Sequence, residues 1–159
     1  MDDSMPPDAR ITPRLIDSLY TEAMLLADEA RAYFDDAARD ERLALDPFGR
    51  VGFACESLKV TTRIMHIVAW LLTQRAVESG ELNRTDGKRP ERRLGTANPS
   101  DERIVEILPM AARRMIAASS DLYARVERLD SGQAGDEPAV SPARALMGRL
   151  ERDLMWIKR

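Results

Sequence analysis

The sequence has few of the residues from which catalytic and metal sites are usually built. It contains one histidine and one cysteine in 159 residues. The lone cysteine, Cys55, cannot form an internal disulfide, which favours a reducing compartment. The lone histidine, His66, has no histidine or carboxylate at the spacing of a zinc or di-metal helix site. Gly-rich phosphate loops and nucleophile–base arrangements are missing as well, so we predict no catalytic residue, no metal and no cofactor.

The sequence also has no large excess of either positive or negative charge. The chain has 24 basic and 27 acidic residues, for a net charge of −3, and this balance gives no overall attraction to nucleic acid or to an anionic membrane. No apolar run approaches the ~18 residues of a membrane span. The acidic first ten residues, MDDSMPPDAR, do not resemble a signal peptide. We expect a cytoplasmic protein with one domain, in which residues 1–11 are disordered.

The longest apolar pattern, CESLKVTTRIMHIVAWLLTQRAV from Cys55 to Val77, predicts the central helix of the fold. Its apolar side chains fill an arc of roughly 200°, whereas a helix with one neighbour needs a stripe of a little over ~100°. We therefore expect this helix to be covered from two sides, with Cys55 as a buried structural thiol. Asp46-Pro47 offers an N-terminal cap, but nearby glycines place the first ordered turn near Val51, and Gly80 ends the helix.

Two further helices are predicted on either side of this one. Thr12-Pro13 starts the first, whose apolar face continues to Ala37 and whose opposite face is acidic, with Leu25 exposed among the acidic residues. The other begins around residues 99–101, and its apolar residues stay on one side of the predicted helix as far as Leu129. Pro109 interrupts this pattern, and the shared phase predicts one kinked helix rather than two.

The connections complete the predicted architecture. Residues 81–99 have no periodicity and are rich in arginine and lysine, which predicts a long basic loop. Residues 131–141 have the composition of a flexible linker, and residues 142–159 follow a short amphipathic helical pattern. The fold is therefore expected to be all-α, an antiparallel three-helix bundle over residues 12–130 with a tethered C-terminal helix. We expect this last helix either to dock on a partner or to fold back on its own bundle.

Three groups of residues are candidates for partner binding. On the central helix, a tryptophan beside an arginine is typical of an interface hot spot, unless a neighbouring helix covers it; an exposed Trp70 is expected to be buried in a homodimer or partner interface. His66 is expected at the surface without a chemical role. The basic loop is expected to be solvated or to dock on an acidic protein surface. The candidates are Arg63, His66 and Trp70; Arg84, Lys88, Arg89, Arg92 and Arg93; and Leu146, Leu150, Leu154 and Ile157.

Three helical segments carry a family resemblance: LIDSLYTEAMLLADEARAYFD (Leu15 to Asp35), the central segment quoted above, and SSDLYARVERLD (Ser119 to Asp130). Together they resemble the alphaproteobacterial DUF1465 family of RcdA-like protease adaptors. The resemblance rests on bundle helices rather than on a catalytic signature. It implies a homodimeric three-helix bundle that helps deliver cell-cycle regulators such as CtrA to the ClpXP protease. The implied partners are the unfoldase ClpX, other adaptor proteins and the proteolysis substrates.

The residues and the resemblance together favour a non-enzymatic adaptor that raises the effective concentration of a cargo near a protease. The alternative is a nucleic-acid-associated or transcription-associated helical regulator. Its support is the basic loop, which lacks aromatic residues for base stacking. A small helical enzyme would depend on Cys55 and His66 alone.

Overall fold

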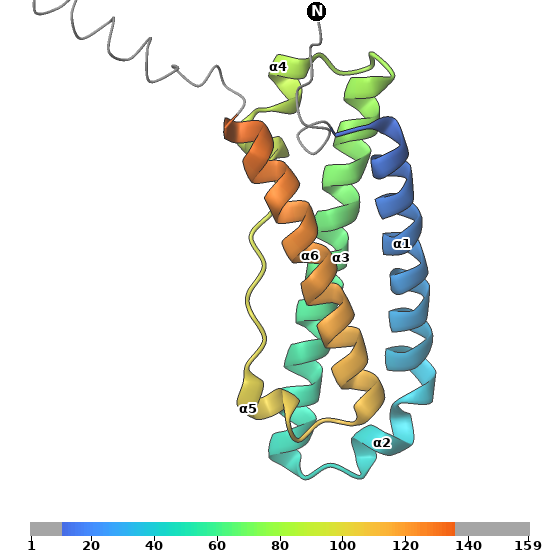
Figure 1. Cartoon of the computed structure of the whole chain (residues 1–159). Coiled ribbons are helices and arrows are strands. Elements are labelled where there is room, and N and C mark those ends of the chain that lie inside the picture. The colour runs from blue at the N-terminus through green and yellow to red at the C-terminus, as the bar shows by residue number, and fades with distance from the viewer. Residues whose placement is uncertain (1–10, 136–159) are drawn as a thin grey trace, which may run out of the picture.

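Three long helices account for most of the structure, a computed structural model that describes residues 11–135 (Figure 1). They are α1 (Pro13–Ala32), α3 (Pro47–Glu78) and α6 (Met110–Gly135). Shorter elements connect them: the π-helical turn η2 (Tyr33–Ala37), α2 (Arg39–Leu43), α4 (Arg84–Gly87), the 3₁₀ turn η3 (Pro90–Arg92) and α5 (Glu102–Val105). The described residues contain no strand, which confirms the all-α three-helix bundle. None of their helices has the length and apolar character needed to cross a membrane.

Side-chain caps start the first two long helices. Thr12 Oγ1 accepts a hydrogen bond from the Leu15 N–H at 3.2 Å at the start of α1. Asp46 Oδ1 accepts from the Gly49 N–H at 2.6 Å at the start of α3. Each cap is followed by a proline at the first helical position, where an amide hydrogen is not needed. Both predicted caps are confirmed.

The start of α3 differs from the predicted position, whereas its end agrees with the prediction. The helix begins at Pro47 rather than near Val51, because the Asp46 cap outweighs the low helix propensity of the two glycines that follow. Its other end is confirmed: Gly80 follows the last turn with a φ of 79°. Glycine adopts this left-handed conformation without the strain that a Cβ would introduce.

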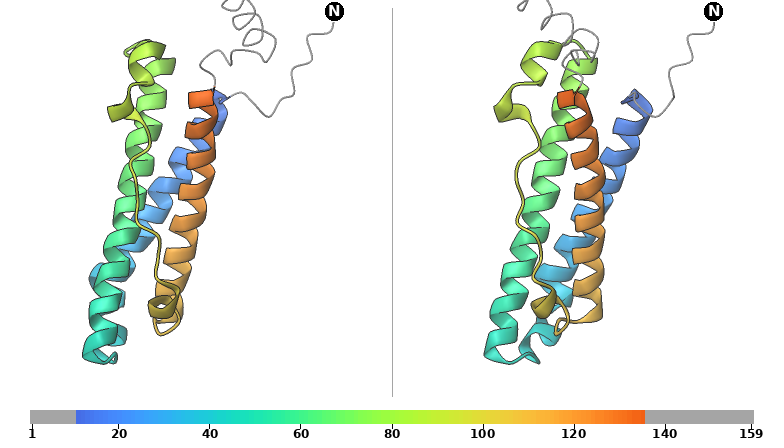
Figure 2. Two further views of the ribbon diagram at one scale, coloured as in Figure 1. Left: turned by 90° about the vertical axis from the view of Figure 1, so that its left-hand side faces the viewer. Right: turned by 60° about the vertical axis from the view of Figure 1, so that its left-hand side comes forward.

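The direction of α6 differs from the prediction. Contacts of α1 and the following η2 with α3 run in opposite order along the chain, which makes α1 and α3 antiparallel: Asp17 of α1 contacts Arg75, and Phe34 of η2 contacts Phe53. In the contacts between α3 and α6, the residue numbers instead increase together along both helices: Arg63 with Ser119, Trp70 with Asp130 and Gln74 with Gln133. α6 therefore lies parallel to α3 and antiparallel to α1 (Figure 2). The predicted antiparallel arrangement is wrong for this third helix.

The long connection between α3 and α6 explains this topology. Residues 93–101 form an extended segment that runs back beside α3, from the end near α4 to the end near α5 (Figures 1 and 2). Because the chain has returned to the end of the bundle at which α3 starts, α6 must run in the same direction as α3. We refer to residues 93–101 as the strap.

Pro109 separates two helices rather than bending one. α5 ends at Val105 and α6 begins at Met110, so the predicted kinked continuous helix is wrong. Proline has no amide hydrogen for the helical ladder and disfavours helical conformation in the residue before it. Arg113 stabilises the break, because its Nε donates to the Leu108 carbonyl at 3.0 Å.

The core lies between the three long helices, and α1 supplies one clean face to it. An aromatic cluster closes one end, with the Tyr33 and Phe34 rings 5.0 Å apart and the Phe34 and Phe53 rings 5.5 Å apart. Leu25 is 61% exposed on the outer side of α1, as predicted. The buried apolar residues include Ile16, Leu19, Ala23, Leu26, Val60, Ile64, Ile67, Leu71, Ala112, Ile116, Leu122 and Val126.

Candidate protein-interaction surface

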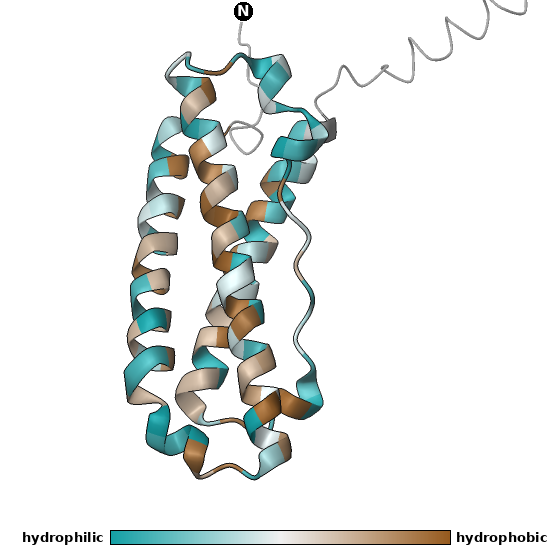
Figure 3. Cartoon of the chain, turned by 180° about the vertical axis from the view of Figure 1, so that it is seen from behind, coloured by the Kyte–Doolittle hydropathy of each residue, from teal (hydrophilic) through white to brown (hydrophobic). Residues whose placement is uncertain are grey.

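One side of α3 carries a row of apolar and small side chains that the described residues leave uncovered. Leu58 and Met65 are 67% and 64% exposed, and Phe48 is 68% exposed. Figure 3 shows apolar residues along this side of α3, between α1 and the strap. We call the row the α3 stripe and define it as Phe48, Val51, Cys55, Leu58, Thr62, Met65, Ala69 and Leu72.

The spacing of the α3 stripe is that of a helix–helix seam. Its positions are separated alternately by three and four residues, which is the seven-residue repeat of helices that pack along their length. The opposite side of α3 faces the bundle core through Phe53, Val60 and Ile67. The helix thus has two apolar faces, which accounts for the wide apolar arc in the sequence. An exposed apolar row of this kind is typical of a protein-interaction site.

Two predictions about α3 are corrected by this arrangement. The helix was expected to be covered from two sides, but residues 11–135 leave the α3 stripe open. Cys55 was expected to be a buried thiol, and it is exposed in this stripe. The sequence alone does not show which of the two apolar faces the other helices cover, because both have helical spacing.

Arg63 is buried and holds the strap. Its side chain is 3% exposed, and its Nη2 donates to the Asn98 carbonyl at 3.1 Å and to Ser100 Oγ at 2.8 Å. Its Nη1 also donates to Ser119 Oγ on α6 at 3.3 Å. Burial lowers the pKa of this guanidinium, and the nearby Glu56 carboxylate partly offsets that effect. The hydrogen-bonding groups of Arg63 are therefore used inside the chain.

Glu56 lies two turns before Arg63 on α3 and also fixes the strap. It is 1% exposed; its Oε1 accepts from Lys59 Nζ at 2.8 Å and from the Asp101 N–H at 3.1 Å. Burial by itself would raise the pKa of this carboxyl group, but the hydrogen bonds outweigh it and leave the pKa below its ordinary value. Sequence reasoning missed Glu56, whose only signal was that α3 has no other carboxylate before its last residue, Glu78.

Trp70 is covered within the chain, which decides between the two alternatives for this residue. Its side chain is 2% exposed, and its Nε1 donates to Asp130 Oδ1 on α6 at 2.9 Å. Arg93 of the strap donates to the same carboxylate at 3.0 and 3.1 Å. The expectation of a partner-buried Trp70 required an exposed side chain in the monomer, and that condition is not met.

His66 is half-buried beneath the strap rather than at the surface. A Cβ placed on Gly95 would lie 2.6 Å from His66 Nδ1, so the strap backbone packs directly on the imidazole ring. The same glycine carbonyl accepts from the Tyr123 hydroxyl at 2.7 Å. Burial is the main reason that the pKa of Tyr123 is raised. Of the three candidates on α3, Arg63 and His66 thus contact the strap directly, and Trp70 shares the Asp130 carboxylate with Arg93 of the strap.

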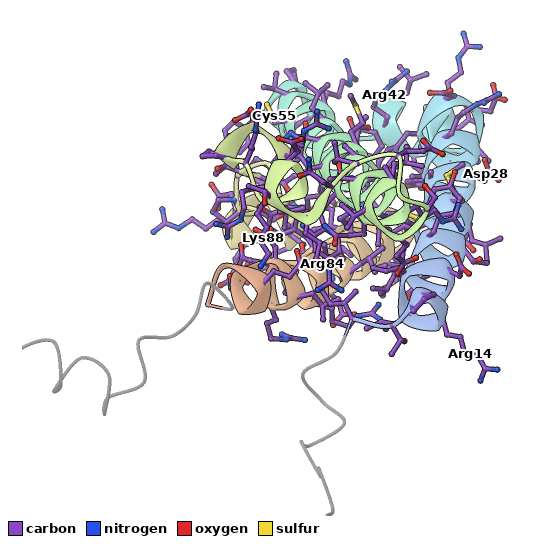
Figure 4. All side chains as sticks on the ribbon, turned by 90° about the horizontal axis from the view of Figure 1, so that it is seen from above. Arg14, Asp28, Arg42, Cys55, Arg84 and Lys88 are labelled. Carbon is purple, nitrogen blue, oxygen red and sulfur yellow. The ribbon has the colours of Figure 1, made fainter. Side chains whose placement is uncertain are left out.

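The basic candidates lie at the end of the bundle near α4. Arg84, Lys88, Arg89 and Arg92 are exposed, and Figure 4 shows Arg84 and Lys88 on this side of the molecule. Arg89 pairs with Asp86 at 2.8 Å, and Arg93 pairs with Asp130. Partner binding by these residues stays a prediction. The tail candidates Leu146, Leu150, Leu154 and Ile157 lie outside the described residues.

The acidic outer side of α1 and η2 offers no comparable site. Asp28, Asp35 and Asp36 line a shallow hollow with Arg31 on the outer surface, on the side of the bundle where Figure 4 labels Asp28. Within residues 11–135, no group of three or more histidine, cysteine or acidic side chains is placed to hold a metal ion.

Comparisons with known proteins agree with the family resemblance. Residues 8–154 match the family described as "Protein of unknown function (DUF1465)". The structure is similar to the crystal structure of RcdA from Caulobacter crescentus CB15, with 32% sequence identity and a TM-score of 0.62, over 77% of this chain and 92% of that one. No curated protein matches the sequence. With a family match over nearly its whole length, the chain belongs to the DUF1465 family.

Proposed function

We propose that this protein is a non-enzymatic adaptor in regulated proteolysis that binds a protein partner through the α3 stripe. The observation that carries the proposal is an exposed apolar row with a helix-packing repeat, on a bundle whose Arg63, Glu56 and Trp70 are engaged internally. Such a fold offers a binding surface rather than reactive groups. Membership of the DUF1465 family and the similarity to RcdA support this role.

In its finer form, the proposal is a cytoplasmic homodimer that helps deliver substrates such as CtrA to ClpXP. One surface holds the cargo or a cargo-bearing adaptor while another engages the complex that contains ClpX. Capture by the unfoldase then becomes effectively intramolecular, so a weak contact between cargo and protease is sufficient. The exposed basic residues near α4 provide a second surface, of opposite character to the α3 stripe.

Capture of partners from a lysate of the host bacterium tests the role of the surface. The full-length chain is immobilised and compared with a Leu58→Asp, Met65→Asp double variant. Leu25→Asp is the matched control, since Leu25 is similarly exposed on α1, at 61% against 67% for Leu58. We expect wild type and the control to recover ClpX or its adaptors, and the stripe variant to lose them.

A reconstituted degradation assay tests the activity itself. Addition of the full chain to ClpXP, CtrA and the other adaptors is expected to speed degradation of CtrA. Unchanged degradation of CtrA and of the captured partners would contradict the adaptor role. Recovery of nucleic acid with no proteolysis component would favour the alternative of a nucleic-acid-associated regulator. A sedimentation experiment that finds only monomer would contradict the homodimer.

A further inference from the structure

The chain contains a second apolar seven-residue repeat besides the α3 stripe. It lies in the sequence after residue 135, where the spacing again alternates between four and three: Ala143, Met147, Leu150, Leu154 and Ile157. Helices with this repeat bury it against each other, and a single helix of this length is marginal in water without such packing. We propose that residues 142–159 form a helix that packs on the α3 stripe of the same chain, antiparallel to α3.

The end of α6 is close enough to the α3 stripe for this contact. Gln133 Nε2 donates to Gln74 Oε1 at 2.8 Å, so the chain leaves α6 beside the turn of α3 that carries Leu72. Residues 136–141 span at most about 20 Å when extended. This reach is enough to pass around a helix with a diameter of about 10 Å including side chains.

The length of the segment also matches the stripe. A helix over residues 142–159 is about 27 Å long at 1.5 Å per residue. The part of the α3 stripe from Leu72 back to Cys55 is about 26 Å long on the same basis. A segment that starts near Leu72 and runs antiparallel to α3 therefore covers most of the exposed row.

The side chains on the two repeats have complementary sizes. Along the α3 stripe the large residues Leu58, Met65 and Leu72 alternate with smaller ones, namely Cys55, Thr62 and Ala69. This alternation leaves spaces between the large side chains. Leucine and isoleucine side chains of the C-terminal repeat fit such spaces in the knobs-into-holes manner of paired helices.

Tethering favours this segment over a second copy of the chain as the occupant. A segment joined by a short linker is present at an effective concentration of roughly millimolar. A second copy at micromolar concentration, with an equally good contact, is outcompeted by the tethered helix. The C-terminal segment is therefore the occupant expected in the isolated protein.

A regulatory consequence follows, and it rests on the proposed function. If the α3 stripe binds a partner in proteolysis, the partner and the C-terminal segment compete for one surface. Binding then requires release of the segment, so the isolated protein is held in a closed form.

Cys55 provides a direct test, because it is the only cysteine in the chain and lies in the stripe. The rate of its reaction with a maleimide is measured in the full-length wild type and in Leu154→Asp, in which the C-terminal repeat is interrupted. The matched control is Ala145→Asp, which adds the same charge on the opposite side of the predicted helix. Circular dichroism and the thermal midpoint check that the bundle is intact in each variant.

We expect Cys55 to react about tenfold more slowly in wild type and Ala145→Asp than in Leu154→Asp, which corresponds to about 1.4 kcal/mol of docking free energy. This protection should not change with protein concentration. Equal rates in all three proteins would overturn the proposal. Protection that disappears on dilution, together with a dimer in sedimentation, would also overturn it and assign the stripe to a second copy.

The measurement separates this proposal from the adaptor role. The measurement uses no protease and no partner. If Cys55 is protected in a protein that fails to accelerate degradation, the docking proposal is supported and only the proposed function is rejected. Conversely, if Cys55 is unprotected in an active adaptor, only the docking proposal is rejected.

Discussion

The Trp70 indole on α3 and the Asp130 carboxylate on α6 form a buried hydrogen bond of 2.9 Å between two parallel helices. Arg93 of the strap donates to the same carboxylate at 3.0 Å. One aspartate thus joins α3, α6 and the strap. A contact that links three segments distant in sequence is expected to stabilise the topology as well as the local packing.

Replacement of Asp130 by alanine is expected to lower the free energy of unfolding by about 1–3 kcal/mol, because it leaves the buried indole N–H without an acceptor. Chemical denaturation measures the loss. In a Trp70→Phe background the same substitution should cost less, since the donor is already absent. The control is Asp121→Ala, an exposed partner of Arg125 on the same helix, with an expected loss of at most about 0.5 kcal/mol. Equal losses in the two backgrounds would contradict the link between these residues.

Arg63 is expected to be the main attachment of the strap to α3. Arg63→Met keeps an apolar chain of similar length but removes the hydrogen bonds to Asn98 and Ser100. We expect a loss of about 2–3 kcal/mol, as for hydrogen bonds that involve a charged group. Amide hydrogen exchange should accelerate over residues 94–101 more than in α1.

A suitable comparison for Arg63 is Arg75→Met. Arg75 pairs with Asp17 at 2.9 Å and lies 3.9 Å from the centroid of the Tyr20 ring, at a partly exposed position. Exposed pairs contribute little, so the loss should be about 0–1 kcal/mol. If the two variants are equally stable and exchange in the strap is unchanged, the anchoring role of Arg63 is wrong.

Periodicity was sufficient to predict a bundle of three long helices, but not the break at Pro109 or the way in which the helices are joined. The caps at Thr12 and Asp46, the stop at Gly80 and the core face of α1 are local features, and each is confirmed. The direction of α6 depends on the strap, which has no periodic pattern. Its position is set by contacts such as Arg63 with Asn98, which lie 35 residues apart in sequence.

For the candidate site too, the sequence predicts local spacing but not contacts between residues far apart in the chain. The wide apolar arc of α3 indicated two buried faces, and the sequence contains the three- and four-residue spacing of the α3 stripe. Which face packs inside the bundle depends on α1 and α6 together. Likewise, the sequence left open whether Trp70 is exposed or covered by a neighbouring helix. The answer depends on Asp130, 60 residues later on α6, which accepts the hydrogen bond of the indole.

The contact between the strap and His66 is expected to tolerate no side chain at Gly95. In Gly95→Ala the new Cβ would lie 2.6–2.7 Å from ring atoms of His66, and the clash should cost about 1–3 kcal/mol. His66→Ala in the same chain should recover much of the loss, which a double-mutant cycle measures. Gly132→Ala serves as the control: nothing lies within 4 Å of its Cβ position in α6, so it should be neutral or stabilising by up to about 1 kcal/mol. Additive effects at positions 66 and 95 would contradict the contact.

The buried Glu56 carboxylate is expected to make stability depend on pH in the acid range. Its pKa in the folded protein lies below the ordinary value of 4.5: burial opposes ionisation, but hydrogen bonds from Lys59, Ser100 and the Asp101 amide favour the charged form more strongly. A lowered folded pKa means that the unfolded chain takes up the proton first as the pH falls. The stabilising contribution is therefore fully present above about pH 4.5 and is lost as the pH falls through the folded pKa.

Glu56→Gln tests this sign directly, because it keeps the shape of the side chain but does not titrate. At neutral pH we expect it to be less stable than wild type by about 1–3 kcal/mol, since a charged acceptor is replaced by a neutral one. The difference should shrink below about pH 4.5, where the wild-type carboxylate also loses its charge. Urea denaturation at a series of pH values measures both curves. A gap that stays constant down to the acid limit would mean that Glu56 does not carry this pH dependence, and a gap that widens there would mean that its folded pKa is raised.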